Sequence, residues 1–421
     1  MKYWKEAKEK DQHDPLAHFR EKFHHPSNEI YLDGNSLGKL PLEAKSKLQE
    51  VINTQWGENL IRSWNDHWLD LPKRLSKKLA SFLNAKSNEI TVGESTSVNL
   101  YKLVEALLHS KQFPQQLITD SLNFPTDNYI LNGSAQKHQM AAPICVQYPT
   151  NLCAAIEQLK TTISSTPGII CLSLVSYKSA YLYPMKVLNA WAKEHQSIII
   201  WDLSHAVGAV DIDLNATQTL AAVGCTYKYL NGGPGAPAFL YLHESLHTQV
   251  ESPIKGWFGH AHPFDFSPQY HAAKDIVKFD AGTPTVLSLA AMETGIDLAL
   301  EASSKTLRLK SEALTAFFIQ CVEDELLSLG YKLETPSQPS QRGSHVTLSH
   351  QASWRICQCL LHGKKDRPKI IPDFRPENYL RFGFAPLYTT FHELVQTVER
   401  LKEIVLSEEY LEYDNSRPQV I

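Results

Sequence analysis

Short apolar runs alternate with stretches of helical periodicity through the first part of the chain. The runs that predict strands cover residues 90–92, 117–120, 168–175, 197–201, 222–226 and 238–242. Helical periodicity lies between several of them, for example over 98–104 and 184–195. The run 168–175 is apolar at nearly every position, as expected for a parallel strand buried on both faces. This alternation predicts an α/β fold built around a mostly parallel sheet.

The pattern changes after about residue 285, where a long helix is predicted to run from Thr285 to about Leu300. More helices follow, together with strand-like stretches over 344–348 and 379–383. Helices are also predicted near the N-terminus, over residues 43–83. The chain is therefore expected to carry a second, smaller α+β unit after the main sheet.

Polar or aromatic residues stand at the carboxyl end of each predicted parallel strand. They are Ser95, Phe124, Ser176, Asp202 and Lys228. Ligands of open α/β sheets bind beyond the carboxyl ends of the strands. We therefore expect these five residues to meet at one rim of the sheet and to form the functional site.

Asp202 and Lys228 are the most informative pair. Asp202 ends an apolar strand, and Lys228 precedes the glycine-rich turn 231–235. A lysine in apolar surroundings can form a Schiff base with an aldehyde cofactor, and a carboxylate can keep the ring nitrogen of that cofactor protonated. The pair indicates pyridoxal phosphate (PLP). The alternative is an ordinary strand-end lysine and an aspartate that caps a loop.

The segment Ser95-Thr96-Ser97 joins a predicted strand to a predicted helix. Hydroxyl groups and free N–H groups at a helix N-terminus bind phosphate well. A simple N-cap would use the same residue types. Three consecutive hydroxyl residues favour the phosphate site.

Two further residues are candidates for contact with a substrate. Arg381 lies in the middle of an apolar strand, where an unpaired charge is costly. We favour a ligand carboxylate over a structural ion pair as its partner, since arginine binds carboxylates bidentately. Trp64 belongs to an aromatic group with Trp56 and Trp68, which forms either core or an aromatic substrate wall.

Composition narrows the class of protein. The 421 residues are 43% hydrophobic and 20% charged, with a formal net charge of -4 and no basic stripe, which argues against nucleic acid as a partner. No apolar run approaches the roughly 20 residues of a membrane span. The charged N-terminus lacks a signal-peptide core, so a cytoplasmic location is expected. The seven scattered cysteines are predicted to be buried, reduced thiols.

Seven motifs together resemble the kynureninase family of PLP enzymes. They are YLDGNSLG, GESTSVNLYK, NFPTDNY, WDLSHAVGAV, TYKYLNGGPG, GWFGH and LRFGFAPLY, in the order of that family and spread over residues 31–388. The resemblance implies PLP-dependent transferase fold type I, with a large domain around a mostly parallel mixed sheet and a smaller α+β C-terminal domain. It implies an N-terminal segment at 1–60, a PLP-binding domain at 61–285 and a small domain at 286–421. The implied reaction is hydrolysis of L-kynurenine to anthranilate and L-alanine in tryptophan degradation.

The resemblance also implies a role for each matching residue. Lys228 would carry PLP and move the α-proton, with Asp202 on the pyridine nitrogen and Tyr227 as an acid or base. The other cofactor contacts would be Phe124 stacked on the ring, Asp127, Ser176, His205 and, at the phosphate, Thr96, Ser97 and Tyr227. Trp257 and Thr283 would reach the phosphate from the partner subunit of a homodimer with shared sites. Arg381, Asn35, Ser36 and Trp64 would bind the substrate.

The chain departs from the family pattern at two places. Residues 177–180 read Tyr-Lys-Ser-Ala where a Tyr-x-Thr-Gly-like turn is expected, and residues 57–59 lack a histidine that some relatives carry before the substrate wall. The second departure leaves open the preference between kynurenine and 3-hydroxykynurenine.

Three other functions are compatible with parts of the pattern. A cysteine desulfurase or aminotransferase could share the fold, although Cys357 and Cys359 lie in a helix-like apolar run rather than in a loop. A metal-dependent hydrolase could use acidic and histidine side chains, but their spacing matches no strong ligand motif; these are Asp202, His205, Asp211, Asp213, His260 and His262. A binding protein without catalytic activity is the third alternative.

Overall fold

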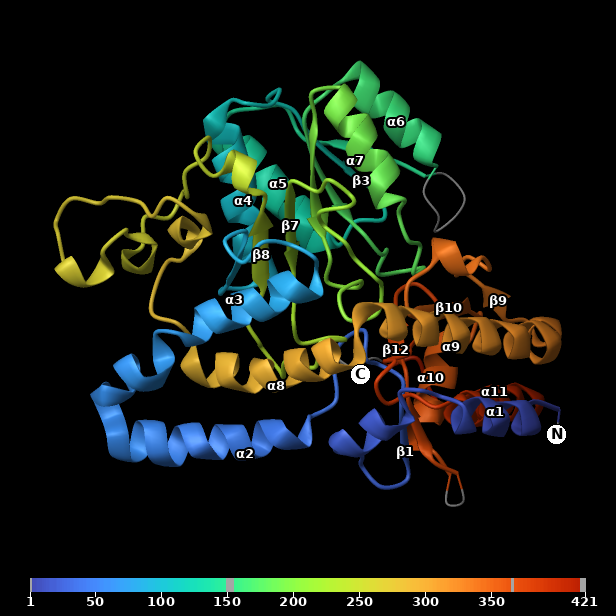
Figure 1. Ribbon diagram of the computed structural model, residues 1–421. Coiled ribbons are helices and arrows are strands. Elements are labelled where there is room, and N and C mark those ends of the chain that lie inside the picture. The colour runs from blue at the N-terminus through green and yellow to red at the C-terminus, as the bar shows by residue number, and fades with distance from the viewer. Residues whose placement is uncertain (1, 149–154, 365–366, 417–421) are drawn as a thin grey trace.

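The computed structural model describes residues 2–148, 155–364 and 367–416. Within these residues the strands form three sheets, of seven, four and two strands. The seven-stranded sheet and its helices make one half of the molecule, and the two smaller sheets lie in the other half with both chain ends (Figure 1).

The seven-stranded sheet has the order β2-β8-β7-β6-β5-β3-β4. Only β8 runs against its neighbours, so the sheet is mixed but mostly parallel. Its strands are β2 (Ile90–Val92), β3 (Leu117–Asp120), β4 (Ile144–Val146), β5 (Ile169–Ser173), β6 (Ile198–Asp202), β7 (Ala221–Gly224) and β8 (Phe239–Leu242).

The central strands β5 and β6 are apolar up to their last residue because helices cover both faces of the sheet. Ile198 and Ile200 of β6 point into one buried cluster with residues of helix α4, whereas Ile199 and Trp201 point into the other. Side chains of a strand alternate between faces, so a strand with two covered faces needs apolar residues at every position. This explains the continuous apolar runs of the sequence.

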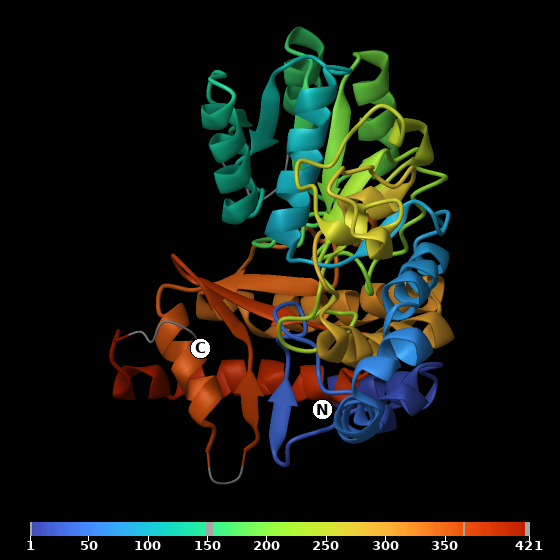
Figure 2. The same ribbon diagram turned by 90° about the vertical axis from the view of Figure 1, so that its left-hand side faces the viewer.

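The smaller sheets lie in the half of the molecule that holds the C-terminal region. Strands β12, β13, β10 and β9 pair antiparallel in that order, and β1 pairs parallel with β11. Figure 2 shows the N-terminal strand β1, in blue, beside these C-terminal elements, in orange and red. The strands are β1 (Glu29–Tyr31), β9 (Lys332–Leu333), β10 (His345–Ser349), β11 (Lys369–Ile371), β12 (Asp373–Arg375) and β13 (Tyr379–Gly383).

The α-helices alternate with the strands of the large sheet and then dominate the C-terminal region. No helix among the described residues is both long and apolar enough to cross a membrane. The bounds of these helices are α1 (Lys2–Gln12), α2 (Leu42–Glu50), α3 (Leu71–Phe82), α4 (Thr96–Ser110), α5 (Pro125–Lys137), α6 (Ile156–Ser165), α7 (Met185–Glu194), α8 (Val286–Ala302), α9 (Ser304–Glu325), α10 (Ser353–His362) and α11 (Phe391–Leu406).

The helices predicted over 43–83 are confirmed, as α2, the π-helices η2 (Val51–Asn59) and η4 (Trp64–Trp68) with the short 3-10 helix η3 (Leu60–Arg62) between them, and α3. Two strands differ in extent from their sequence predictions. Strand β5 stops before Leu174, whose carbonyl oxygen accepts a hydrogen bond from the amide of Tyr183 instead of continuing the ladder. Strand β7 ends at Gly224 because the next amide, of Cys225, donates to the hydroxyl oxygen of Ser204.

Candidate active site

Lys228 follows the carboxyl end of β7, at the start of a tight glycine turn. The amide of Asn231 donates to the carbonyl oxygen of Lys228 over 2.9 Å, and Gly233 has a φ of 91°, a conformation that favours glycine. The Nζ atom of Lys228 lies 2.9 Å from Nε2 of His205. The turn therefore holds the backbone of Lys228, and its amine faces a histidine at the neighbouring strand end.

Asp202 stands at the carboxyl end of β6 and is buried. Its Oδ1 accepts hydrogen bonds from the amide and the hydroxyl of Ser204, over 2.8 and 2.6 Å. The same hydroxyl oxygen accepts from the amide of Cys225 over 3.1 Å. Ser204 therefore fixes the carboxylate and ties the end of β6 to the segment that leads to Lys228. Sequence reasoning missed Ser204, although an Asp-x-Ser spacing is a known turn signal.

Burial and neighbouring charges set the protonation of the groups around Lys228. Burial raises the pKa of Asp202, and the hydrogen bonds from Ser204 and the charge of Lys228 oppose this shift. Burial and then the charge of Asp202 raise the pKa of Asp127 well above its usual value. Burial, followed by the charges of Lys228 and Arg381, holds the pKa of His205 well below its usual value. His205 is therefore a neutral imidazole beside the amine.

Phe124, Asp127 and Ser176 lie at the neighbouring strand ends. The ring of Phe124 meets the ring of Tyr177 edge to face at 5.2 Å. Asn123 fixes this loop, since its Oδ1 accepts from the amide of Phe124 over 3.1 Å and from the hydroxyl of Ser173 over 2.5 Å. Sequence reasoning also missed Asn123. Because of it, the Phe124 loop is held against β5.

Several buried polar atoms in this group have no hydrogen-bond partner among the described residues. They are Oδ2 of Asp127, Oγ of Ser176 and Nδ1 of His205. A buried polar group left unpaired costs about 1–3 kcal/mol. Together with the amine of Lys228 and the carboxylate of Asp202, these atoms fit a polar, ring-shaped cofactor such as PLP.

The predicted phosphate residues lie at the start of α4 and line a cleft of about 1700 Å³. The side chain of Ser95 caps the helix by accepting from the amide of Val98 over 3.3 Å. The N-cap interpretation is confirmed for Ser95, Thr96 and Ser97 line the cleft, and their contact with a phosphate stays a prediction. Tyr227 and Thr283 line the same cleft.

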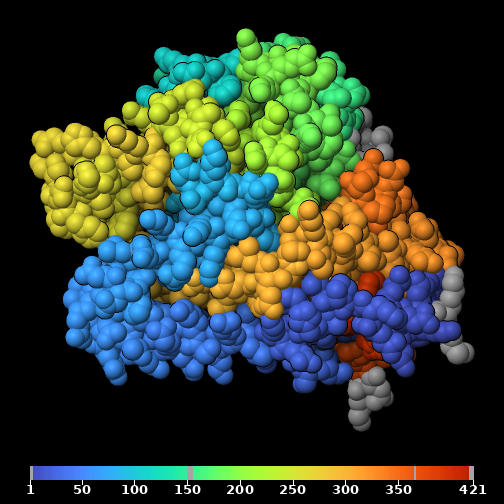
Figure 3. Space-filling view, viewed as in Figure 1, coloured from blue at the N-terminus to red at the C-terminus, as the bar shows by residue number. Residues whose placement is uncertain are grey.

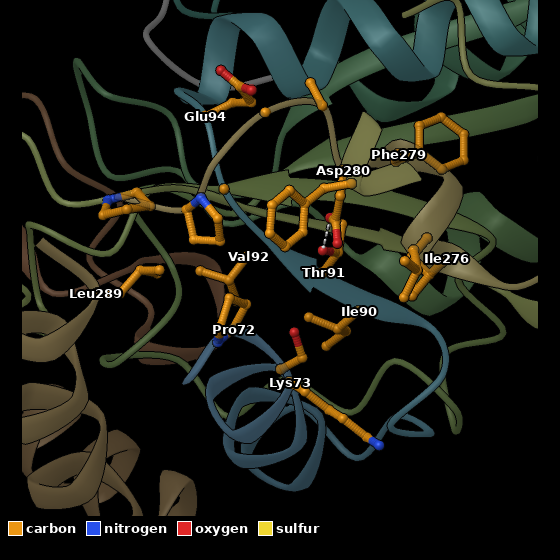
Figure 4. A pocket seen from close by; sticks show the side chains of 18 of the residues that line it. Pro72, Lys73, Ile90, Thr91, Val92, Glu94, Ile276, Phe279, Asp280 and Leu289 are labelled. Carbon is orange, nitrogen blue, oxygen red and sulfur yellow. Dashed lines mark hydrogen bonds between the residues drawn. The ribbon is translucent and has the colours of Figure 1, made fainter. Parts of the chain in front are cut away.

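Two buried hydrogen bonds fix the chain just before Thr283. The hydroxyl of Thr91 donates to the carboxylate of Asp280, as the close view shows (Figure 4). The Nζ atom of Lys102 donates to the carbonyl oxygen of Phe279 over 2.8 Å. These bonds hold the chain before Thr283 against β2 and α4.

Arg381 is fully buried on β13 and is held by protein groups. Its guanidinium pairs with the carboxylate of Asp373 on β12 and donates to the carbonyl oxygen of Tyr177. Nε of Arg375 pairs with the same carboxylate oxygen, Oδ2 of Asp373, at 3.0 Å. The ion pair with Asp373 is the structural alternative that the sequence left open, and contact with a substrate carboxylate stays a prediction.

The loop of the N-terminal segment that carries two predicted substrate residues lies close to Lys228. The amide of Gly38 donates to the carbonyl oxygen of Tyr227 over 2.8 Å, so the loop that carries Asn35 and Ser36 reaches the chain beside Lys228. A Cβ atom at Gly38 would lie 2.4 Å from the carbonyl oxygen of Lys228, so only glycine permits this approach.

Trp64 and Trp257 belong to a different part of the molecule. Trp257 begins the short helix η6 (Trp257–Gly259), in a segment that stands out from the body (Figure 3). Trp64 stacks on Phe258 of the same helix, with ring centroids 6.1 Å apart. The structure thus brings Trp64 to the projecting segment, and its contact with substrate stays a prediction.

Solved structures with the same fold include a cysteine desulfurase and a protein with a PLP cofactor. An apo cysteine desulfurase from Thermococcus onnurineus NA1 matches with a TM-score of 0.76 at 16% sequence identity, over 95% of this chain and 98% of that chain. A C-DES mutant, with glycine covalently linked to its PLP cofactor, matches with a TM-score of 0.79 at 16% identity, over 91% of this chain and 99% of that chain. At this identity the likeness shows the fold alone.

The family follows from the sequence comparisons. The model of the class-V aminotransferases matches residues 30–353, and that of the kynureninase C-terminal domain matches residues 307–401. A kynureninase from Pseudomonas fluorescens is 40% identical over 400 residues, which are 94% of each chain. One from Burkholderia mallei (strain SAVP1) is 37% identical over 413 residues, which are 97% of each chain. The chain belongs to the kynureninase family.

Family membership confirms four of the sequence predictions: the resemblance, the α/β fold of type I, the class of PLP-dependent enzymes and the cofactor itself. It also decides against the cysteine desulfurase alternative, for which Cys357 and Cys359 are in any case buried on α10. Cys145 is exposed, contrary to the prediction of buried thiols, and Cys153 lies outside the described residues. Within the described residues no group of three or more metal-ligating side chains is placed to hold an ion.

Proposed function

We propose that this member of the kynureninase family hydrolyses L-kynurenine to anthranilate and L-alanine. The observation that carries the proposal is the arrangement of Lys228, His205 and Asp202 at adjacent strand ends, in a chain with kynureninase relatives over nearly its whole length. Lys228 holds the cofactor, and Asp202 keeps a proton on its ring nitrogen. When bound, PLP supplies the electron sink that stabilises negative charge at the substrate's Cα.

Other residues of the chain bind the cofactor and the substrate. Phe124 would stack on the cofactor ring, Asp127, Ser176 and His205 would hold its edge, and Thr96, Ser97 and Tyr227 would bind its phosphate. Arg381 binds the α-carboxylate of the substrate, with Asn35 and Ser36 beside it, and Trp64 flanks the aromatic ring.

Two side chains move protons. Lys228 would take the proton from Cα of the substrate as a free amine, once the substrate's own amine has replaced it at the cofactor aldehyde. Water then adds to the side-chain carbonyl, the Cβ–Cγ bond breaks with its electron pair on Cβ, and anthranilate leaves; protonation of Cβ gives L-alanine. Tyr227 donates or accepts the proton at the side chain, because it adjoins both Lys228 and the phosphate residues of the cleft. Burial raises the pKa of Tyr227, which favours its protonated form.

The assembly and the cellular role are parts of the same proposal. Two copies form a homodimer in which Trp257 and Thr283 of one copy reach the phosphate in the other. The projecting segment of Figure 3 supports this, since it exposes Phe264 and Phe266 beside Trp257. The enzyme acts in the cytoplasm in tryptophan degradation and also accepts 3-hydroxykynurenine. The domain boundaries proposed for it are 1–60, 61–285 and 286–421.

The experiment mixes the purified protein with PLP and L-kynurenine and follows anthranilate fluorescence. Lys228→Ala is the matched variant and should release no anthranilate and lack the visible absorbance of the lysine-bound cofactor. The proposal fails if the wild-type protein releases no anthranilate, or if Lys228→Ala releases it at the wild-type rate.

A further inference from the structure

His345 lies on the same face of the small sheet as Arg381. In the antiparallel pair of β10 and β13, His345 is opposite Gly383 and Thr347 is opposite Arg381. Directly opposed residues, and residues two apart on one strand, project to the same face of a sheet. Gly383 has no side chain, and Asn35 fills the space there, since a Cβ atom on Gly383 would lie 1.7 Å from Oδ1 of Asn35.

This face meets the rim of the large sheet at Lys228. The ring of His345 lies 5.8 Å from the ring of His205, measured between centroids. His205 is in turn 2.9 Å from the amine of Lys228. His345 is completely buried. It therefore belongs to the space between the two sheets where the substrate amine must meet the cofactor.

The polar atoms of His345 and Asn35 are unsatisfied in this space. Neither ring nitrogen of His345 and neither amide atom of Asn35 has a hydrogen-bond partner of normal geometry among the described residues. The carbonyl oxygen of Lys178 accepts from the hydroxyl of Thr347 and also interacts with the imidazole, which raises the pKa of His345 against the effect of burial. Buried unpaired groups of this kind cost about 1–3 kcal/mol each, so they are expected to meet a ligand.

Arg381 alone provides only part of a carboxylate site. One of its terminal nitrogens pairs with Asp373, and the other donates to the carbonyl oxygen of Tyr177. Asp373 also offsets its positive charge. A second carboxylate arriving at this guanidinium therefore needs further donors nearby, and Asn35 and His345 are buried on the same face.

We propose that His345 donates a hydrogen bond to the α-carboxylate of the amino-acid substrate and shares this group with Arg381 and Asn35. The inference rests on the proposed function and assigns one more residue to its substrate site. Burial, followed by the charges of Arg381 and Lys228, holds the pKa of His345 well below its usual value. The imidazole is therefore neutral, with one N–H to donate and no further positive charge to bury.

The test compares two ligands that differ only at this carboxylate. The holoenzyme is titrated with L-alanine and with L-alaninamide, and binding is followed by the visible absorbance of the cofactor. In His345→Leu, the Kd for L-alanine should rise about tenfold or more, which corresponds to about 1.4 kcal/mol. The Kd for L-alaninamide should stay within about twofold, since the amide lacks the charge that His345 recognises.

Two further variants separate recognition from structure. His345→Gln keeps an N–H donor of similar reach and should retain most of the affinity for L-alanine, whereas the shorter His345→Asn should lose it as His345→Leu does. If His345→Leu does not fold, the comparison of His345→Gln with His345→Asn still tests whether an N–H donor at this position binds the carboxylate. His350→Gln is the matched control, because His350 is also buried but its ring packs on Tyr331, at 4.9 Å. It should leave both Kd values unchanged.

The inference is overturned if His345→Leu and His345→Asn bind L-alanine as the wild type does. It is equally overturned if they lose affinity for both ligands to the same degree, which would make His345 a structural residue. The anthranilate assay on the wild-type protein is separate. If that assay fails while the difference between the two ligands persists, the proposed reaction is wrong but His345 remains a carboxylate-binding residue.

Discussion

Replacing Ser204 with alanine tests how the acid opposite the lysine is held. The hydroxyl of Ser204 donates to Oδ1 of Asp202 over 2.6 Å and accepts from the amide of Cys225 over 3.1 Å. All three residues are buried. Ser204→Ala removes both bonds but keeps the amide of residue 204 on Asp202. The carboxylate is then fixed by one hydrogen bond in place of two.

The expected loss has two parts. A hydrogen bond to a charged group contributes about 1.5–3 kcal/mol, and a buried amide left unpaired costs about 1–3 kcal/mol. Because the two parts share one hydroxyl, we expect the free energy of unfolding to fall by roughly 3 kcal/mol. The hydroxyl bond also opposes the rise in the pKa of Asp202, so its loss raises that pKa further. Asp202 is then a weaker partner for a protonated ring nitrogen, and PLP should bind about tenfold more weakly.

The control is Ser197→Ala. Ser197 directly precedes β6, whose opposite end carries Asp202. The hydroxyl of Ser197 accepts from the amide of Gly168 over 3.0 Å and donates to the carbonyl oxygen of His195 over 3.2 Å. It should cost roughly 2 kcal/mol of stability and leave the cofactor site intact. Urea unfolding of the apo-proteins gives the stability, and titration with PLP gives the affinity.

Ser204→Ala and Ser197→Ala should therefore differ in their effect on the cofactor site. Both lose stability, but only Ser204→Ala should bind PLP more weakly and turn over more slowly. The reasoning is refuted if Ser204→Ala keeps the wild-type affinity and kcat, or if Ser197→Ala loses them equally.

Three further predictions address other residues. Tyr227→Phe should lower kcat by about 10²–10⁴-fold while PLP stays bound; steady-state kinetics with an unchanged kcat would dismiss its role as acid or base. Arg381→Ala should raise KM by about tenfold or more, since a charged hydrogen bond is worth about 1.5–3 kcal/mol; a wild-type KM would assign Arg381 to the ion pair with Asp373 alone. Burial raises the pKa of Asp120 to about 6 against its hydrogen bonds, so the folded state favours the neutral acid. The stability that the protonated Asp120 contributes is thus full below about pH 4 and declines by about 3 kcal/mol as the pH rises through 6. Asp120→Asn should remove this decline, which is measured as the difference in the free energy of unfolding between urea curves at pH 4.5 and 7. The same difference in the wild type and in Asp120→Asn would contradict the prediction.

The sequence predicted the large sheet well because its signal is local. Runs such as 198–201 are apolar on both faces, and a polar residue stands at the end of the strand or a few residues beyond it. Asp202 and Lys228 could be placed together from this pattern alone, since the carboxyl ends of parallel strands share one rim. Strand β11, in contrast, pairs with β1 more than 300 residues away in sequence, and the sequence did not predict β11 or this pairing.

The residues whose roles could not be predicted from the sequence act through contacts between distant segments. Ser204 matters because Cys225 follows the adjacent strand, and Asn123 matters because Ser173 lies beside it. Asp373 meets Arg381 only through the pairing of β12 with β13. His345 is an ordinary strand residue until the small sheet is set against Lys228. Such roles depend on tertiary geometry and leave no local signal.

One measurement tests the central claim, that Lys228 is the amine on which the chemistry depends. The protein is incubated with PLP, reduced with borohydride and digested, and the labelled peptide is sequenced by mass spectrometry. We expect the reduced cofactor on Lys228 alone. Lys39 is the informative competitor, because burial lowers its pKa to about 8 and makes it a second reactive amine. A label on Lys39, or on any lysine other than Lys228, would contradict the account.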